Sequence, residues 1–353
     1  MHPARTSRGR LTAFMSLCVL ALALAAAAPL RADEPGRFQW VTSSLAPKDI
    51  GYAIHVREIL FQAIVEACEG NMSIKGFWGG ILGDDRASLR LIEEGRIQAA
   101  GLSGQGAYAA CPEAAVFGLP FILESYEETD YLKEKMISVF DGILADRGLK
   151  ILMWLDQGFD QIYCTSDALR TPADFRGVRF AQWFEPLDAP LFDRLGASHT
   201  EMDPVDIPDA IRSKELQAVL APSIWVVGAQ LHTTFTHVNP MKVRYTPSFF
   251  VASLEEYNKL PEKWRKNIMD ARLDKAFEFN RHARDELSRF YKAIVQYGVV
   301  ETVPDRAAME RFREITMPIR KELAGDLYPA ALLEEMQAHL AEYRKAQSVG
   351  DAR

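Results

Sequence analysis

The stretch FQWVTSSLAPKDIGYAIHVREILFQAIVEACEGNMSIKGF, residues 38–77, decides the fold class. It begins with a strand-like run at 38–42 and ends with another at 72–77. Between these runs, apolar residues recur at the spacing of one helix face: Val56, Ile59, Leu60, Ala63, Ile64 and Ala67. A short helix is expected at 84–94 and a buried strand at 97–102. This order of strand, helix, strand, helix, strand predicts a parallel sheet whose faces are covered by helices.

The same pattern begins again after about residue 156, which indicates a second α/β unit. Further strands are expected at 150–155, 161–165, 177–181 and 218–221. From Glu262 the chain is typical of helix, with one apolar stripe up to about Val295. A helix of about 30 residues would be about 45 Å long, which is more than one unit needs. We therefore expect this helix to brace both units.

The first 32 residues have the composition of an export signal. Three arginines between residues 5 and 10 precede an apolar run at 11–28 that carries no charge. This order is typical of a secretory signal peptide, and we place its cleavage after Ala32. A short membrane anchor is the alternative, since the run is about as long as a minimal membrane span. A lipid anchor on Cys18 is disfavoured because the bulky Leu17 precedes it.

The remaining chain is acidic. Removal of the segment and its four arginines changes the formal net charge from −7 to −11. This charge argues against nucleic acid and anionic lipid as partners. About 320 residues remain, which suits two domains of ordinary size.

Three cysteines remain after cleavage, namely Cys68, Cys111 and Cys164. An odd count permits at most one disulfide in an oxidising compartment, and Cys68 with Cys111 is the candidate pair. Three buried thiols are the preferred interpretation, because spacing alone does not bring two cysteines together.

Patterns associated with cofactors or catalysis are weak. The segment GQGAYA at 104–109 fits a loose dinucleotide loop, but it follows the third strand and lacks the later acidic residue. Glycines that let a loop approach a ligand or the facing lobe are the preferred interpretation. Ser103 is in no nucleophile elbow, because Gln105 stands where a glycine is needed. His232 and His237 have no carboxylate-rich neighbourhood, so we expect neither a metal site, a cofactor nor catalysis.

Asp160 is the acidic residue that stands out, because it lies among apolar residues at the start of an expected strand. A buried carboxylate needs a cation or a ligand. Pairing with a lysine or arginine is the preferred interpretation, and contact with a ligand is the alternative.

A series of short motifs runs along the mature chain. They are GILGDD at 80–85, LIEEGRIQA at 91–99, PE at 112–113, GLPFIL at 118–123, TPADFRGVRF at 171–180, LGA at 195–197 and LP at 260–261. In this collinear order they resemble the DctP-type solute-binding proteins of TRAP (tripartite ATP-independent periplasmic) transporters over nearly the whole mature chain.

This resemblance implies an α/β, two-lobed periplasmic-binding-protein fold (type II-like), with crossing strands and a long helix that bridges the lobes. The expected boundaries are 1–32 for the signal peptide, 33–156 with 243–282 for lobe 1, 157–242 with 283–345 for lobe 2, and 346–353 for a flexible tail. It also implies a periplasmic receptor that encloses a small ligand and delivers it to the membrane subunits of a TRAP transporter.

The residues that hold a ligand carboxylate in most members of this family are absent here. Members use an arginine directly after the motif that ends at Phe180, and some use a second one at an earlier strand start. The corresponding residues in this chain are Ala181 and Asp160. The chain also departs from the family at Lys214, Gln217 and Ala221.

Aromatic residues dominate the expected cleft instead. They are Phe159, Trp183, Phe184 and Trp225, with Trp78 and Trp154 as further candidates, and we expect about half of them to be core. Enclosing an anion without a paired cation is costly, and Asp160 would repel it. We therefore expect a hydrophobic, neutral or cationic ligand, with a cation held by Asp160 and aromatic faces.

Two alternatives stay open. The first is an organic-acid receptor whose cation is Lys214 or Arg179, since Arg179 shares a strand face with Ala181. For Arg179, a surface or cross-lobe cation is the preferred interpretation. The second alternative is an exported scaffold or sensor-coupled binding protein that does not serve uptake.

Overall fold

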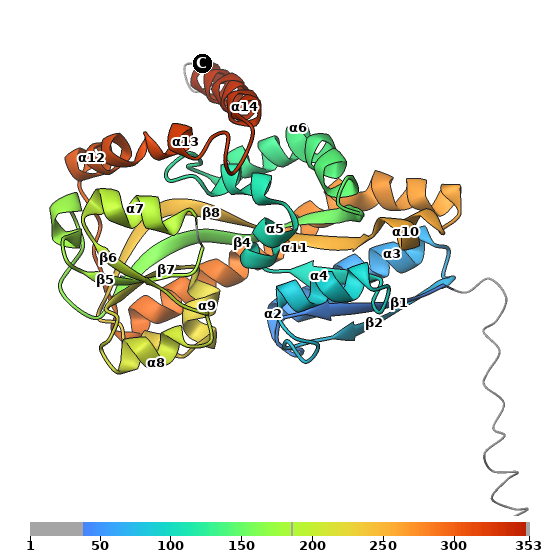
Figure 1. Cartoon of the computed structure of the whole chain (residues 1–353), viewed down its shortest axis with the longest axis horizontal. Helices are drawn as coiled ribbons and strands as arrows, with labels where there is room; N and C mark the ends of the chain where they lie inside the picture. The colour runs from blue at the N-terminus through green and yellow to red at the C-terminus, as the bar shows by residue number, and fades with distance from the viewer. Residues whose placement is uncertain (1–37, 185, 351–353) are drawn as a thin grey trace, which may run out of the picture. The chain divides into compact units, whose positions relative to one another are not determined.

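Two long antiparallel strands form the centre of the fold in a computed structural model that describes residues 38–184 and 186–350 (Figure 1). β4 (Leu149–Cys164) and β8 (His237–Ser253) pair along their whole length. The sequence predicted two separate strands in place of β4, which was wrong, and it did not identify β8. Gly158 has φ +110° and lies at a bulge between 156 and 158, so the polar segment there bends within the strand and does not end it.

The other strands extend the sheet on both sides of this pair. They are β1 (Phe38–Ser44), β2 (Met72–Phe77), β3 (Ala99–Leu102), β5 (Arg179–Gln182), β6 (Ser198–Glu201), β7 (Ala218–Ala221) and β9 (Val300–Glu301). The order is β2-β1-β3-β8-β4-β7-β5-β6, and β9 pairs with β8. β1 runs parallel to β3, and β5 runs parallel to β6 and β7. The predicted parallel pairing is therefore confirmed within each half of the sheet.

Helices and 3-10 turns connect these strands. They are α2 (Gly51–His55), the π-helical η1 (Val56–Phe61), α3 (Gln62–Ala67), α4 (Asp85–Glu93), α5 (Gly104–Ala110), η2 (Pro112–Gly118), α6 (Tyr126–Ala145), η3 (Pro172–Phe175), α7 (Asp188–Leu195), α8 (Ile207–Arg212), α9 (Ser223–Gly228), η4 (Leu231–Thr233), α10 (Leu254–Asn258), α11 (Glu262–Tyr297), α12 (Arg306–Thr316), α13 (Ile319–Glu322) and α14 (Ala330–Gly350). None of the helices in the described part of the chain is long and apolar enough to cross a membrane.

The predicted bridging helix is α11, which the 36 residues Glu262–Tyr297 form. Near its beginning, Asn267 donates to a carbonyl of α3 at 3.0 Å. In its middle, Asn280 donates to a carbonyl of β4 at 3.3 Å, and near its end the carbonyl of Leu287 accepts from the Ser223 hydroxyl of α9 at 2.8 Å. Figure 1 shows this orange helix running from the side of α3 to the side of α9. The expectation that it braces both halves is confirmed.

Three apolar cores among the described residues bear on the site. One lies between the sheet and α5, α6 and α14 and includes Trp154, which contacts Phe117 and Phe140 at ring distances of 4.7 and 4.9 Å. Trp154 is therefore core, and its candidacy as a wall of the ligand cleft was wrong. The other two cores cover opposite faces of β5, because Phe180 belongs to one and its neighbour Ala181 to the other.

Two boundary expectations are corrected or stay predictions. The tail expected at 346–353 is helical up to Gly350, because α14 meets no glycine or proline before that residue. The described residues from Gln39 onward form one compact unit, so the lobe boundaries 33–156, 157–242, 243–282 and 283–345 stay predictions. The expected signal peptide at 1–32 lies outside the described residues.

The three cysteines Cys68, Cys111 and Cys164 are buried free thiols. The preferred interpretation is therefore confirmed, and the candidate disulfide between Cys68 and Cys111 is not formed. Burial raises the pKa of Cys68 to about 11 and that of Cys111 to about 12, which keeps both thiols protonated and weakly reactive.

Candidate functional site

The carboxyl ends of two strands from opposite sides of the sheet meet at the middle of β4 and β8. β3 ends at Leu102 against β8, and β7 ends at Ala221 against Gln161 of β4. The segment 157–161 and its partner segment 244–248 therefore lie between the two ends. Ligands of open α/β sheets bind outside the carboxyl ends of strands, so this segment is the candidate site.

Asp160 lies in this segment, is fully buried, and receives its cation from the opposite residue of β8. The Nε of Arg244 donates to Asp160 Oδ2 at 2.6 Å. The Nη1 of Arg244 donates to Oδ1 of Asp188 at the start of α7. The Thr246 hydroxyl donates to Asp160 Oδ2 at 2.9 Å. The interpretation that Asp160 is paired with a cation is confirmed.

The guanidinium of Arg244 is held in one orientation. Asp188 Oδ2 accepts the backbone N–H groups of Trp183 and Phe184 at 3.0 and 2.9 Å, so both oxygens of this carboxylate act as acceptors. The guanidinium carbon lies 4.3 Å from the centroid of the Phe184 ring, which is a cation–π contact. Two ion pairs and one ring therefore fix the plane of the guanidinium.

Three buried polar atoms at this place have no hydrogen-bond partner within the described ranges. They are Arg244 Nη2, Asp160 Oδ1 and the hydroxyl of Tyr108 on α5. The charges of Arg244 and Asp160 act on Tyr108, whose ring packs edge-on against Phe184 at 5.6 Å. Buried polar atoms in folded proteins nearly always have a partner, so these three are candidates for contact with a polar ligand. We call Tyr108, Asp160, Asp188, Arg244 and Thr246 the Arg244 cluster.

The cluster has an excess of negative charge. Burial raises the pKa of Asp160 to about 6 against the opposing effect of Arg244, and Asp188 raises it further. Burial also raises the pKa of Tyr108 above its ordinary value, so its hydroxyl stays protonated. Burial lowers the pKa of Arg244, but Asp188 and Asp160 raise it by more. Counted by formal charges, one guanidinium and two carboxylates give the cluster a charge of −1.

The first residues of α5 lie directly on the cluster. Gln105 Nε2 donates to the carbonyl of Trp183 at 2.8 Å. A methyl group on Gly104 would overlap the methyl group of Thr246 and would lie 3.1 Å from the Phe184 ring. Only glycine allows this approach, so Gly104 brings the start of α5 against the facing half of the molecule, as the preferred interpretation of that segment held, whereas Gly106 approaches Asp85 of α4.

Of the residues predicted to contact a ligand, Asp160 and Phe184 lie at the cluster, and Trp183 adjoins it through its backbone N–H. Trp225 packs on Trp183 with ring centroids 4.5 Å apart. Ala181, two residues before Trp183, is buried in the same core as these rings. The structure therefore brings several of the predicted residues together, and their contact with a ligand stays a prediction.

The other predicted contact residues lie elsewhere. Phe159 belongs to the core on the other face of the sheet and packs on Tyr245 with ring centroids 5.7 Å apart. Trp78 packs on Phe61 at 5.9 Å. Arg179 is exposed and donates to two backbone carbonyls. None of these three side chains contacts the Arg244 cluster in the described structure.

Arg244, Tyr108 and Asp188 belong to the candidate site but were not named by the sequence analysis. Two signals point to Arg244: the run KVRYT at 242–246 alternates polar and apolar residues as strands do, and a lone buried acid requires a cation nearby. Tyr108 lay within a segment whose glycines, and not its tyrosine, were considered for approach to a ligand or to the facing lobe. For Asp188 the sequence carries no comparable signal.

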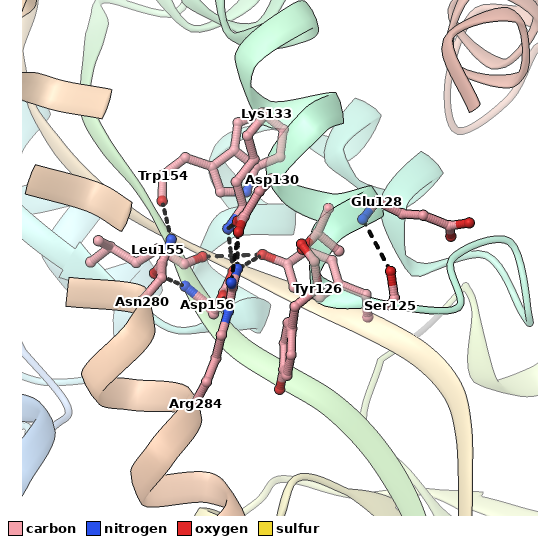
Figure 2. Close-up of polar contacts among 12 residues, drawn as sticks. Ser125, Tyr126, Glu128, Asp130, Lys133, Trp154, Leu155, Asp156, Asn280 and Arg284 are labelled. Carbon is pink, nitrogen blue, oxygen red and sulfur yellow. Dashed lines mark hydrogen bonds and ion pairs between the residues drawn. The ribbon is translucent and has the colours of Figure 1, made fainter. Parts of the chain in front are cut away.

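A second buried ion network joins β4 to α6 and α11 (Figure 2). Asp156 accepts from Lys133 of α6 and, at 2.6 Å, from Nε of Arg284 of α11. Arg284 also binds both oxygens of Asp130, at 2.7 and 2.5 Å. The Tyr245 hydroxyl donates to Asp156 as well. Because these charged groups satisfy one another, we interpret the network as structural.

Catalytic and metal chemistry find no support in the side-chain arrangement. The hydroxyl of Ser103 donates to Asp85 and not to a histidine. Within the described residues, no group of three or more His, Cys, Asp or Glu side chains could hold a metal ion, and this includes His232 and His237.

Comparison of the sequence with known proteins gives one family. The chain matches the profile of the family described as bacterial extracellular solute-binding protein, family 7 (DctP) over residues 53–326. It is 22% identical over 299 residues to the ectoine/5-hydroxyectoine-binding periplasmic protein UehA of Ruegeria pomeroyi, a match that covers 81% of this chain and 87% of that protein.

Solved structures share the fold. A TRAP periplasmic solute-binding protein from Ochrobactrum anthropi has a TM-score of 0.80 at 19% identity, covering 88% of this chain and 97% of that one. The sugar acid binding protein DctPAm from Advenella mimigardefordensis, in complex with galactonate, has a TM-score of 0.78 at 18% identity, covering 88% and 99%. The expected two-lobed periplasmic-binding-protein fold is confirmed.

Proposed function

As the chain belongs to family 7 of the bacterial extracellular solute-binding proteins, the DctP family, we propose that it captures a small polar solute at the Arg244 cluster and delivers it to TRAP membrane subunits. Members of this family are binding receptors and not enzymes. The observation that carries the proposal is the set of unpaired buried atoms on Arg244, Asp160 and Tyr108 between two strand ends.

The purely hydrophobic ligand that the aromatic residues suggested is not favoured. An apolar molecule would leave Arg244 Nη2, Asp160 Oδ1 and the Tyr108 hydroxyl without partners. Each buried polar group left unpaired costs about 1–3 kcal/mol. A ligand with its own donors and acceptors removes this cost, so a polar solute fits the cluster better.

The cation for a polar solute is Arg244 and not Arg179 or Lys214. The side chain of Arg179 is exposed, and its Nε and Nη2 donate to the carbonyls of Glu215 and Lys214 at 2.7 and 2.9 Å. Lys214 is itself exposed. Arg244, in contrast, is 2% exposed and keeps one nitrogen free of protein partners in the described structure.

The relatives bind polar solutes. UehA is named for ectoine and 5-hydroxyectoine, and DctPAm was solved with galactonate. Both kinds of ligand carry several hydrogen-bonding groups, in keeping with a polar ligand for this chain. No contact among the described residues favours the alternative of an exported scaffold or sensor-coupled protein.

The test is ligand affinity in matched arginine variants. The ligand that copurifies with the protein is identified by native mass spectrometry and titrated by calorimetry. Arg244→Gln should lower its affinity by about 10- to 100-fold, because a charge-assisted hydrogen bond is worth about 1.5–3 kcal/mol. Arg179→Gln removes an exposed cation and should leave the affinity unchanged. A loss of affinity in Arg179→Gln but not in Arg244→Gln would show that Arg179, and not Arg244, binds the ligand.

A further inference from the structure

The charges of the Arg244 cluster restrict the class of ligand it can hold. Asp160, Asp188 and Arg244 are at most 2% exposed. Among the residues that the structure describes, the charges that act on Asp160 are those of Arg244 and Asp188. Lys242, the next cation on β8, turns away, since its ammonium lies 5.1 Å from the Phe159 ring and donates to a carbonyl at 3.0 Å. A ligand therefore meets one guanidinium and two carboxylates.

The two charged atoms that remain unpaired have opposite character. Asp188 uses both oxygens, and Arg244 uses Nε and Nη1, so Nη2 is the remaining donor. Asp160 uses Oδ2 for Arg244 and Thr246, so Oδ1 is the remaining acceptor. These atoms belong to two side chains that are hydrogen-bonded to each other, so one small molecule bound beside the pair would meet both.

We propose that the ligand is a small zwitterion, whose carboxylate binds Arg244 Nη2 and whose cationic nitrogen binds Asp160 Oδ1. This inference rests on the proposed function and names the ligand class of the same site. A zwitterion adds no net charge to a buried cluster whose formal charge is −1. It also gives a partner to both unpaired atoms, and Tyr108, on which the charges of Arg244 and Asp160 act, offers a further neutral donor.

Other ligand classes fit this arrangement less well. A dicarboxylate would bring two more negative charges to a buried site with one free N–H donor group, and its desolvation would not be offset. A monocarboxylate would pair with Arg244 but would place its charge beside ionised Asp160. A simple amine would pair with Asp160 and leave the Arg244 nitrogen without a partner.

The test compares molecules of the same shape that differ in the cationic nitrogen. Glycine betaine is paired with 3,3-dimethylbutanoate, and proline with cyclopentanecarboxylate; succinate represents the dicarboxylates. Affinities are measured by calorimetry on ligand-free protein at pH 7.5. At least one zwitterion should bind about 10- to 100-fold more tightly than its matched acid. In Asp160→Asn, which keeps the shape and an acceptor oxygen, this preference should shrink by at least tenfold.

Equal or tighter binding of the acids, or of succinate, would overturn the zwitterion proposal. If no probe binds, the molecule released from the purified protein decides, and a ligand without a cationic nitrogen overturns it as well. The site itself is tested separately by Arg244→Gln. An acid whose binding is lost in Arg244→Gln would refute only the zwitterion, whereas a ligand unaffected by both Arg244→Gln and Asp160→Asn would refute the site.

Discussion

Asp160 makes the stability of the protein depend on pH in a direction that is unusual for an aspartate. Its ordinary pKa is 3.8, and burial raises this value to about 6 in the folded protein. Between these two values the folded protein holds a proton that the unfolded chain has lost. The stabilising effect of this proton is fully present below pH 3.8, decreases as the pH rises, and is lost above about pH 6. The difference between the two pKa values corresponds to about 3 kcal/mol.

The substitution Asp160→Asn should remove this dependence. Asparagine resembles the protonated aspartate and still offers an oxygen to Arg244 and Thr246. Near pH 4 we expect the variant and the unmodified protein to have similar free energies of unfolding. At pH 7.5 the variant should be more stable by up to about 3 kcal/mol, because it carries no buried charge. A residue kept for binding at a cost in stability is a common feature of functional sites.

Urea denaturation of the ligand-free protein between pH 4 and pH 7.5, followed by tryptophan fluorescence, measures these free energies. Asp209→Asn is the matched control, since the Asp209 side chain is 90% exposed, and its difference from the unmodified protein should stay flat with pH. If the curves of Asp160→Asn and the unmodified protein run parallel from pH 4 to pH 7.5, the account of a buried Asp160 near Arg244 and Asp188 is refuted.

Three more predictions follow from the packing. Gly104→Ala should weaken ligand binding by roughly tenfold or more, because its methyl group overlaps Thr246. The control Gly142→Ala should leave the affinity unchanged, because a methyl group there meets nothing within 4 Å. Equal calorimetric affinities of the two variants would contradict this prediction. Lys133→Met should lower the free energy of unfolding by about 3–5 kcal/mol, because it removes the α6 cation that pairs with the buried Asp156. Urea denaturation measures this free energy, and a decrease below 1 kcal/mol would show that the Lys133–Asp156 pair is dispensable. The described cysteines should not react with a thiol reagent at pH 8 until the protein is unfolded in guanidinium, since burial raises their pKa values. Rapid labelling of the native protein would contradict their burial.

The sequence predicted those helices and strands whose pattern of apolar residues lies within the element itself. The residues spaced from Val56 to Ala67 are buried along one helical stretch from α2 to α3, because a 3.6-residue period survives any tertiary context that buries one face. The helix that begins at Glu262 was likewise predicted from the apolar stripe within its own sequence. In β4 the polar segment Asp156–Gly158 favoured a break, but pairing with β8 on both sides of it holds the strand together through a bulge.

The site depended on contacts that no local pattern contains. Asp160 and Arg244 are 84 residues apart, and only the register of β4 against β8 places them opposite each other. A buried acid calls for a cation, so the pairing was predictable while the identity of its partner was not. Tyr108 reaches the cluster because α5 closes on the facing half of the molecule through Gly104, which is a property of the assembled fold.

A crystal structure of the protein with the ligand it carries from expression tests the central claim most directly. We expect the ligand to lie between the ends of β3 and β7, with polar atoms within about 3.5 Å of Arg244 Nη2 and Asp160 Oδ1. A ligand bound elsewhere, with both of these atoms still lacking a partner, would contradict the claim that the Arg244 cluster is the binding site.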